Sequence, residues 1–107
     1  MPNTWRDELT DNLCSAFAKL GTCEEVYAFL EDVASISEIK SMSQRLEVAR
    51  LLNEGKKYPE VVSLTGASTA TISRVKKCLD YGAGGYKTVL KHDEHDKIFA
   101  ILKLREE

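Results

Sequence analysis

The sequence lacks several features that would place it in other classes of protein. Its 107 residues contain no apolar run close to the ~20 residues of a membrane-spanning helix. The first residues, MPNTWRDELTD, do not show the basic and then apolar pattern of a secretion signal, so we expect a cytoplasmic protein. The three cysteines, Cys14, Cys23 and Cys78, are odd in number and widely spaced, which favours reduced thiols over a disulfide framework.

Signatures of catalysis and of cofactor binding are also missing. No nucleophile–base pair or pair of acids suggests an enzyme. The histidines of His92-Asp93-Glu94-His95-Asp96 are three residues apart, but at a helix start such a cluster is ordinary, and we expect no metal. The segment YGAGGY at 81–86 has no preceding strand and no GK[ST] signature, so it indicates a flexible link rather than a phosphate-binding loop.

The apolar pattern that is present is helical, and we find no β-pattern of useful length. One compact domain over 1–107 is expected, because the chain is too short for two and 43% of it is hydrophobic. The fold class is all-α with about six helices. They are predicted at 5–20, from 22 to about 33, at 37–54, from 58 to the glycine at 66, at 68–80 and at 93–105.

Several residues mark the predicted helix ends. Thr4 is the predicted N-cap of the first helix, and Thr22 with Glu25 matches a capping box at the start of the second. Gly55 ends the third helix, whose main apolar stripe is predicted at Ile39, Met42, Leu46, Ala49 and Leu52, widened by Val48 and Leu51. Glu47 and Arg50 are three residues apart and can form an ion pair.

Residues 58–80 have the outline of a helix-turn-helix. Pro59 suits the first turn of a short helix, for which Val61, Val62 and Leu64 are the predicted apolar anchors. Gly66 supplies the backbone freedom of a sharp turn, and Ser68 is a good N-cap for the next helix. Ile72, Val75 and Leu79 are spaced to face inward. A motif of this kind presents its second helix to the DNA major groove.

Small polar and basic residues remain on the outward side of that second helix. Thr69, Thr71 and Ser73 can bond base edges or phosphates, and Ala70 can meet a thymine methyl group. Arg74, Lys76 and Lys77 can reach phosphates. Positive charge is concentrated around the same helix. Residues 56–91 hold seven basic and two acidic side chains, whereas residues 1–55 hold five basic and ten acidic side chains. The local positive field therefore favours binding to nucleic acid despite a net charge of −2.

Two other functions fit the same pattern. The helix-turn-helix can dock a protein, which would make the chain a helical interaction module. It can also belong to a DNA-binding accessory of replication or transposition machinery that has no regulatory ligand. A steep loss of affinity with rising salt and preference for one DNA sequence would support a regulator. No DNA binding even at low salt, with a stable protein partner recovered instead, would support the interaction module.

Two segments carry a resemblance to a known family. MSQRLEVARLL at 42–52 and LTGASTATISR at 64–74 resemble the Trp repressor superfamily, and more closely its YerC/YecD-type branch of helix-turn-helix regulators. The resemblance implies an intertwined homodimer that binds operator DNA, with residues 1–55 in dimerisation and 93–105 completing the dimer core. It also implies that Ser68, Thr69, Ala70 and Ser73 face the operator, with Thr71 beside them. Lys76 and Lys77 complete the predicted DNA-binding set.

The resemblance further implies an effector pocket. Arg45 and Arg74 match the two arginines that flank the indole ring in the Trp repressor, so Arg45, Arg74, Val75 and Cys78 form the candidate pocket. However, Val75 stands where the family has a glycine and Cys78 where it has a serine. Added bulk and a weak hydrogen-bond partner oppose tight tryptophan binding, and we expect no cofactor.

Overall fold

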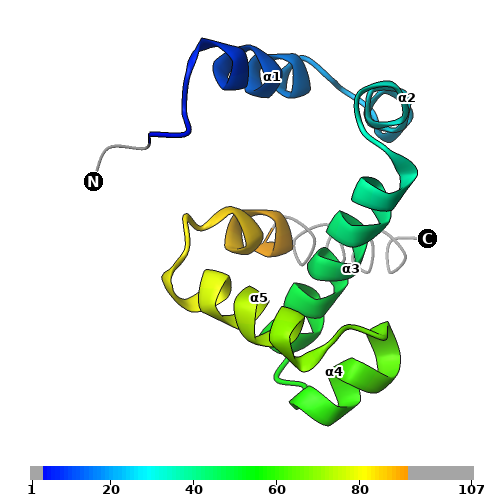
Figure 1. Ribbon diagram of the computed structural model, residues 1–107, viewed down its shortest axis with the longest axis vertical. Coiled ribbons are helices and arrows are strands. Elements are labelled where there is room, and N and C mark those ends of the chain that lie inside the picture. Colours follow the sequence, from blue (N-terminus) through cyan, green and yellow to red (C-terminus); the bar gives the residue numbers. More distant parts are fainter. Residues whose placement is uncertain (1–3, 92–107) are drawn as a thin grey trace, which may run out of the picture. The chain divides into compact units, whose positions relative to one another are not determined.

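The computed structural model describes residues 4–91, and within this range every regular element is a helix (Figure 1). The helices are α1 (Glu8–Ala18), α2 (Cys23–Val33), α3 (Ile36–Asn53), α4 (Tyr58–Thr65) and α5 (Thr69–Tyr81). Residues 85–91 are also helical. The all-α class is therefore confirmed, with six helical segments in the described part. The helix predicted at 93–105 and the two histidines lie outside the described residues.

The chain divides into two compact units, with the boundary between Ile39 and Lys40. In the first unit, α1 starts later than predicted. Its N-cap is Asp7 and not Thr4, because the Asp7 carboxylate accepts from the Thr10 amide at 2.9 Å while the Thr10 hydroxyl accepts from the Asp7 amide at 2.8 Å. The bond from the Thr10 amide holds the pKa of Asp7 below its ordinary value of 3.8.

The start of α2 follows the predicted capping box in part. The Thr22 hydroxyl accepts from the Glu25 amide at 3.2 Å, as expected, but the Glu25 carboxylate reaches back to the amide of Gly21 rather than that of Thr22. Phe17 and Phe29 meet edge to face with ring centroids 5.0 Å apart. Neither α1 nor α2 contains a buried residue. The apolar faces of both helices therefore remain accessible in the single chain.

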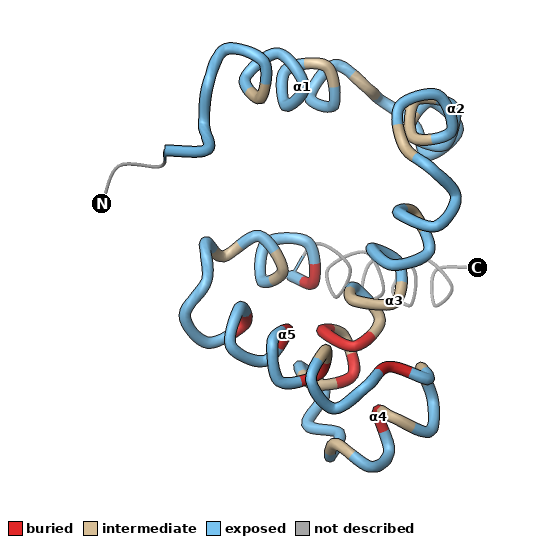
Figure 2. Tube along the Cα trace, in the orientation of Figure 1, coloured by how far each residue is buried: buried red, intermediate tan, exposed pale blue. Residues whose placement is uncertain are grey.

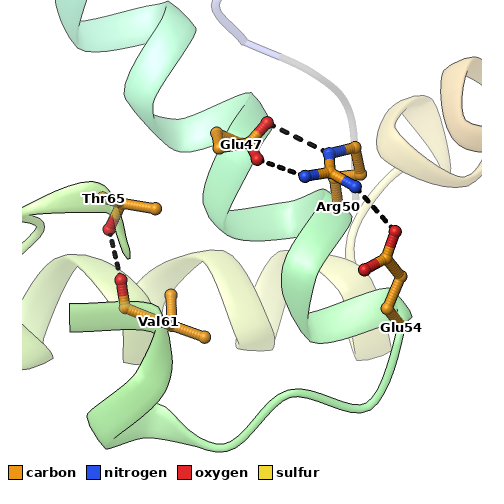
Figure 3. Close-up of polar contacts among 5 residues, drawn as sticks. All are labelled: Glu47, Arg50, Glu54, Val61 and Thr65. Carbon is orange, nitrogen blue, oxygen red and sulfur yellow. Dashed lines mark hydrogen bonds and ion pairs between the residues drawn. The ribbon is translucent and has the colours of Figure 1, made fainter. Parts of the chain in front are cut away.

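Helix α3 is held at both ends by local bonds. Ser35 and Glu38 form a reciprocal cap at its start, with bonds of 2.8 and 3.1 Å. At its end the Gly55 amide bonds Leu52 and the Lys56 amide bonds Leu51, with Gly55 at φ +89°, which is a Schellman motif. Along the helix, Arg50 binds the carboxylates of Glu47 and Glu54 (Figure 3), so the predicted Glu47–Arg50 pair is confirmed.

The core of the second unit lies between α3, α4, α5 and the helical segment that follows. Figure 2 shows the buried positions on the sides where these helices face one another. The buried residues are Val48, Ala49, Leu51, Val61, Ala67, Ile72, Val75, Leu79 and Leu90. The predicted inward face of α5 is confirmed, since Ile72, Val75 and Leu79 are 7% exposed or less. Each Å2 of apolar surface removed from water contributes about 25 cal/mol to the stability of the fold, and burial of these three side chains therefore holds α5 against its neighbours.

Two details of the predicted core are wrong. Leu64 was expected to anchor α4 but is 62% exposed, because α4 packs through Val61, one turn earlier. In α3, Met42 and Leu46 of the predicted main stripe are exposed, whereas Val48 and Leu51 are buried. The side of α3 that meets α4 and α5 is set by tertiary packing, which the apolar spacing within one helix does not specify.

Gly66 ends α4 in a left-handed conformation, with φ +71° and ψ 6°. Replacing Gly66 by alanine is expected to lower the free energy of unfolding by about 1–2 kcal/mol, because an L-residue at positive φ brings Cβ close to the next carbonyl. Space is not the cause, since no atom lies within 4 Å of an added Cβ. Urea denaturation followed by circular dichroism measures the change.

Two variants control this prediction. Asparagine tolerates the left-handed region, so Gly66→Asn should cost less than Gly66→Ala. Gly85 also has open space around an added Cβ but no positive φ and lies in a helical segment, so Gly85→Ala should be neutral or slightly stabilising. Equal stability of Gly66→Ala and the wild type would contradict the strain argument.

Candidate nucleic-acid interface

The turn between α4 and α5 has its polar groups paired within the second unit. The Gly66 amide donates to the Val62 carbonyl at 2.8 Å. The Thr65 hydroxyl donates to the Val61 carbonyl at 2.7 Å (Figure 3) and accepts from the Ala67 amide at 3.1 Å. Ala67 is 2% exposed, so the turn is packed against the core as well as bonded. These contacts fix the direction in which α5 leaves α4.

A side chain from α3 completes this arrangement. The Gln44 amide group donates to the Thr65 carbonyl at 3.2 Å, and the bond is partly buried. That carbonyl belongs to the last turn of α4, where carbonyls have no partner within the helix. The bond therefore joins the helix-turn-helix to α3 at the turn itself.

Helix α5 begins at a well-formed cap. Ser68 has extended backbone dihedrals, and its hydroxyl accepts from the Thr71 amide at 3.1 Å. The Ser68 hydroxyl also lies 3.1 Å from that of Thr71. The predicted N-cap at Ser68 is therefore confirmed. Its hydroxyl is engaged in the cap, while its position at the exposed N-terminus of α5 keeps it beside the outward face.

The predicted DNA-binding residues lie together on the outward side of α5. Ser68, Thr69, Ala70, Ser73, Lys76 and Lys77 are exposed, and Thr71 is half-buried. Because Ile72, Val75 and Leu79 bury the opposite side, this face contributes nothing to the core. Its first five residues, 69–73, carry only short side chains at the exposed positions, which allow the backbone to approach a partner closely.

The charges on this face are not equally available. Lys76 Nζ lies 3.3 Å from Asp80 Oδ1, one turn further along α5. Near the start of α4, Lys56 lies 3.8 Å from Glu60. Exposed pairs of this kind contribute about 0–1 kcal/mol to stability. Among residues 4–91, Arg74 and Lys77 have no such carboxylate partner, so their charges are open to another ligand.

The four residues of the candidate effector pocket are distributed over different environments. Val75 is 1% exposed and belongs to the core, Arg45 is half-buried, and Arg74 is exposed. Cys78 is exposed and lines an open hollow of about 500 Å3. The other residues of its lining are Leu46, Gly82, Ala83, Gly84, Gly85, Tyr86 and Val89. Of the four, Cys78 is the one that borders this mostly apolar hollow.

Three residues that shape the interface were missed from the sequence. Gln44 and Thr65 are 21 positions apart, and no local signal joins them. Asp80, in contrast, stands four residues after Lys76, a spacing that brings side chains together on a helix and could have been noticed. Thr65 precedes the glycine of the turn, where a hydroxyl commonly bonds nearby backbone.

Other kinds of site find little support in the described range. Residues 4–91 contain no group of three or more His, Cys, Asp or Glu side chains placed to hold a metal ion. None of the described helices has the length and apolar character needed to cross a membrane.

Similar proteins share this architecture. The sequence profile of the Trp repressor protein family matches residues 8–94. Uncharacterized protein YerC of Bacillus subtilis (strain 168) is 49% identical over 85 residues, which are 79% of this chain and 82% of YerC. A candidate Trp repressor from Staphylococcus aureus has a TM-score of 0.79 at 40% identity, covering 83% of this chain and 89% of that one. A TrpR-like protein from Eubacterium eligens ATCC 27750 has a TM-score of 0.80 at 44% identity, covering 85% and 94%.

Proposed function

Because this chain belongs to the Trp repressor family, we propose that it is a dimeric transcriptional regulator. It would bind operator DNA sequence-specifically and repress transcription. The observation that carries the proposal is the outward face of α5. It is exposed, polar and basic, and it is held at a defined angle by the Gly66 turn and the Gln44 bond. An α-helix with these properties fits the major groove of B-DNA.

The roles on this face follow from side-chain chemistry. Thr69 and Ser73 lie one turn apart and offer hydroxyls that donate or accept at base edges, and Ala70 between them offers a methyl group to thymine. Arg74, Lys76 and Lys77 lie further along and suit phosphates. Direct readout is therefore proposed for Thr69, Ala70 and Ser73, and positioning for Arg74, Lys76 and Lys77.

The first unit supports the dimeric part of the proposal. Leu9 is 78% exposed, Tyr27 is 68% exposed and Val33 is 52% exposed, although α1 and α2 are both amphipathic. Large apolar side chains exposed on two amphipathic helices favour a protein–protein contact at this unit. A second copy of the chain would cover these faces, with residues 1–55 as the dimerisation part. The segment 93–105, proposed to complete that core, lies outside the described residues.

Two-fold symmetry then defines the DNA site. Two copies of α5 would enter successive major grooves about 34 Å apart, so the operator would be nearly palindromic with half-sites one helical turn apart. The structure also bears on the choice of effector. Burial of Val75, where the family has a glycine, argues against a flat ring stacked on that part of α5.

The proposed roles predict different effects for two substitutions on α5. Thr69→Ala should change the preferred sequence, because it removes about 1–3 kcal/mol of discrimination between base pairs at the contacted position. Lys77→Ala should weaken binding to all sequences and reduce the slope of log affinity against log salt by about 1, because one phosphate contact is lost. Fragments selected from genomic DNA in vitro provide the preferred sequence, and fluorescence anisotropy measures both affinities.

Glu107→Gln provides a control, since it removes one charge outside residues 58–80 and outside the two segments assigned to dimerisation. Equal effects of Thr69→Ala and Lys77→Ala on every sequence would contradict the assigned roles. Absence of DNA binding by the wild type at low salt would sink the proposal and favour a protein-docking module.

A further inference from the structure

Asp80 is an acid on the basic face of α5. The residues Thr69, Ser73, Lys76 and Asp80 are separated by four, three and four positions, so they follow one stripe along the helix. The Asp80 side chain is 42% exposed, and its Oδ1 lies 3.3 Å from Lys76 Nζ. The stripe that starts with the two candidate base-reading hydroxyls therefore ends in a carboxylate paired with a candidate phosphate ligand.

Stability does not explain an acid at this position. Asp80 lies in the last turn of α5, where the helix dipole is negative and favours a cation. No basic residue occupies that turn to compensate. Both side chains of the Lys76–Asp80 pair are exposed, so solvent screens the pair and its contribution to folding is small. Removal of the charge at Asp80 should therefore leave the fold intact or make it slightly more stable.

The carboxylate has a larger effect on an anionic ligand. In the unbound protein it pairs with Lys76, so that the Lys76 ammonium group is shared between this carboxylate and any phosphate that it binds. In a complex with DNA on the outward face of α5, the carboxylate would lie near the phosphates and repel them. Both effects act on the backbone of any sequence, because phosphates are the same at every site.

We propose that Asp80 limits the affinity of α5 for DNA by pairing with Lys76 and repelling the phosphate backbone. This inference rests on the proposed DNA-binding function and adds a residue to it that opposes binding. It gives Lys76 and Lys77, which are neighbours in sequence, different roles. Lys77 binds phosphate without a competitor among the described residues, whereas Lys76 is held back by Asp80.

Asp80→Asn tests the proposal, because it removes the charge and keeps the shape. The variant is expected to bind both the selected operator and unrelated DNA about three- to tenfold more tightly at 0.1 M salt, with a salt slope steeper by about 1. The ratio of the two affinities should stay the same. Glu107→Gln is the control, since it makes the same change in net charge outside the helix-turn-helix and outside the two segments assigned to dimerisation.

A double-mutant cycle tests whether the gain in DNA affinity from Asp80→Asn acts through Lys76. In a Lys76→Ala background, the gain from Asp80→Asn should fall well below its value in the wild type, because there is no lysine to release. The urea midpoint of Asp80→Asn should be unchanged or raised. A lowered midpoint would show a structural role and overturn the proposal, as would unchanged or weaker DNA binding.

The outcomes also separate this inference from the function on which it rests. If the wild type binds DNA and Asp80→Asn binds no better, the inference is wrong and the proposed function stands. If Glu107→Gln gives the same gain as Asp80→Asn, net charge is the cause and the local role of Asp80 is wrong. If no variant binds DNA at low salt, both fail together.

Discussion

Replacing Ile72 by alanine is expected to lower the free energy of unfolding by about 2–5 kcal/mol. Ile72 is fully buried near the start of α5, with Val61 of α4 and Val48 of α3 also fully buried in the same cluster. Truncation removes apolar surface and leaves a cavity that surrounding helices can fill only partly. Alanine has the higher helix propensity, so loss of packing and not loss of helix is the cause.

Urea denaturation at one fixed protein concentration measures this change, because stability depends on concentration in an oligomer. Ile72→Val is the graded control and should cost about 0.5–1.5 kcal/mol. An unchanged m-value would show that the same surface is exposed on unfolding. A loss below about 1 kcal/mol for Ile72→Ala would mean that α5 is not held by this core, and that its orientation toward DNA is not fixed as argued above.

Leu9→Asp is expected to raise the dissociation constant of the proposed dimer at least ~100-fold. Leu9 is 78% exposed in the single chain, so its substitution removes no packing there. Under a partner subunit, the change loses about 1.5–3 kcal/mol of leucine burial and adds the larger cost of an enclosed carboxylate. Since about 1.4 kcal/mol corresponds to tenfold, 100-fold is a lower estimate.

The position of Leu9 protects this experiment from one alternative explanation. Leu9 lies in the first turn of α1, where an added acid is favourable to the helix dipole, so loss of assembly cannot be attributed to loss of α1. Light scattering over a dilution series measures the association. Leu64→Asp is the control: Leu64 is also exposed, at 62%, but lies on α4 in the second unit. A wild type that is monomeric at all concentrations would remove the dimer from the proposal.

Local signals were sufficient to predict the helix-turn-helix. Ser68 caps α5 because a hydroxyl three residues before an amide can accept its bond, and this depends on sequence spacing alone. Gly66 was predicted at the turn because few residues tolerate positive φ. Ile72 and Leu79 face inward because their spacing matches the helical repeat. Each of these features is decided within a few residues of the chain.

Features that depend on tertiary structure were not predicted. The bond from Gln44 to the Thr65 carbonyl exists only once α3 has packed beside α4. Exposure of Met42 and Leu46 reflects the side that α3 turns toward the core, which its own sequence leaves undecided. The first cap was misplaced at Thr4 because Thr10, instead of the usual Glu or Gln, completes the cap at Asp7. The DNA contacts of Thr69 and Ser73 stay predictions, since folding does not constrain what an exposed face binds.

The absence of buried residues from α1 and α2 has a consequence for the order of folding during synthesis. The buried residues of the described chain all lie between Val48 and Leu90, so the first 39 residues are synthesised before any of these core residues. Helices of 11 residues are too short to persist alone in water. The part synthesised first therefore has nothing in its own unit to fold onto, and the stable structure starts from the part synthesised later.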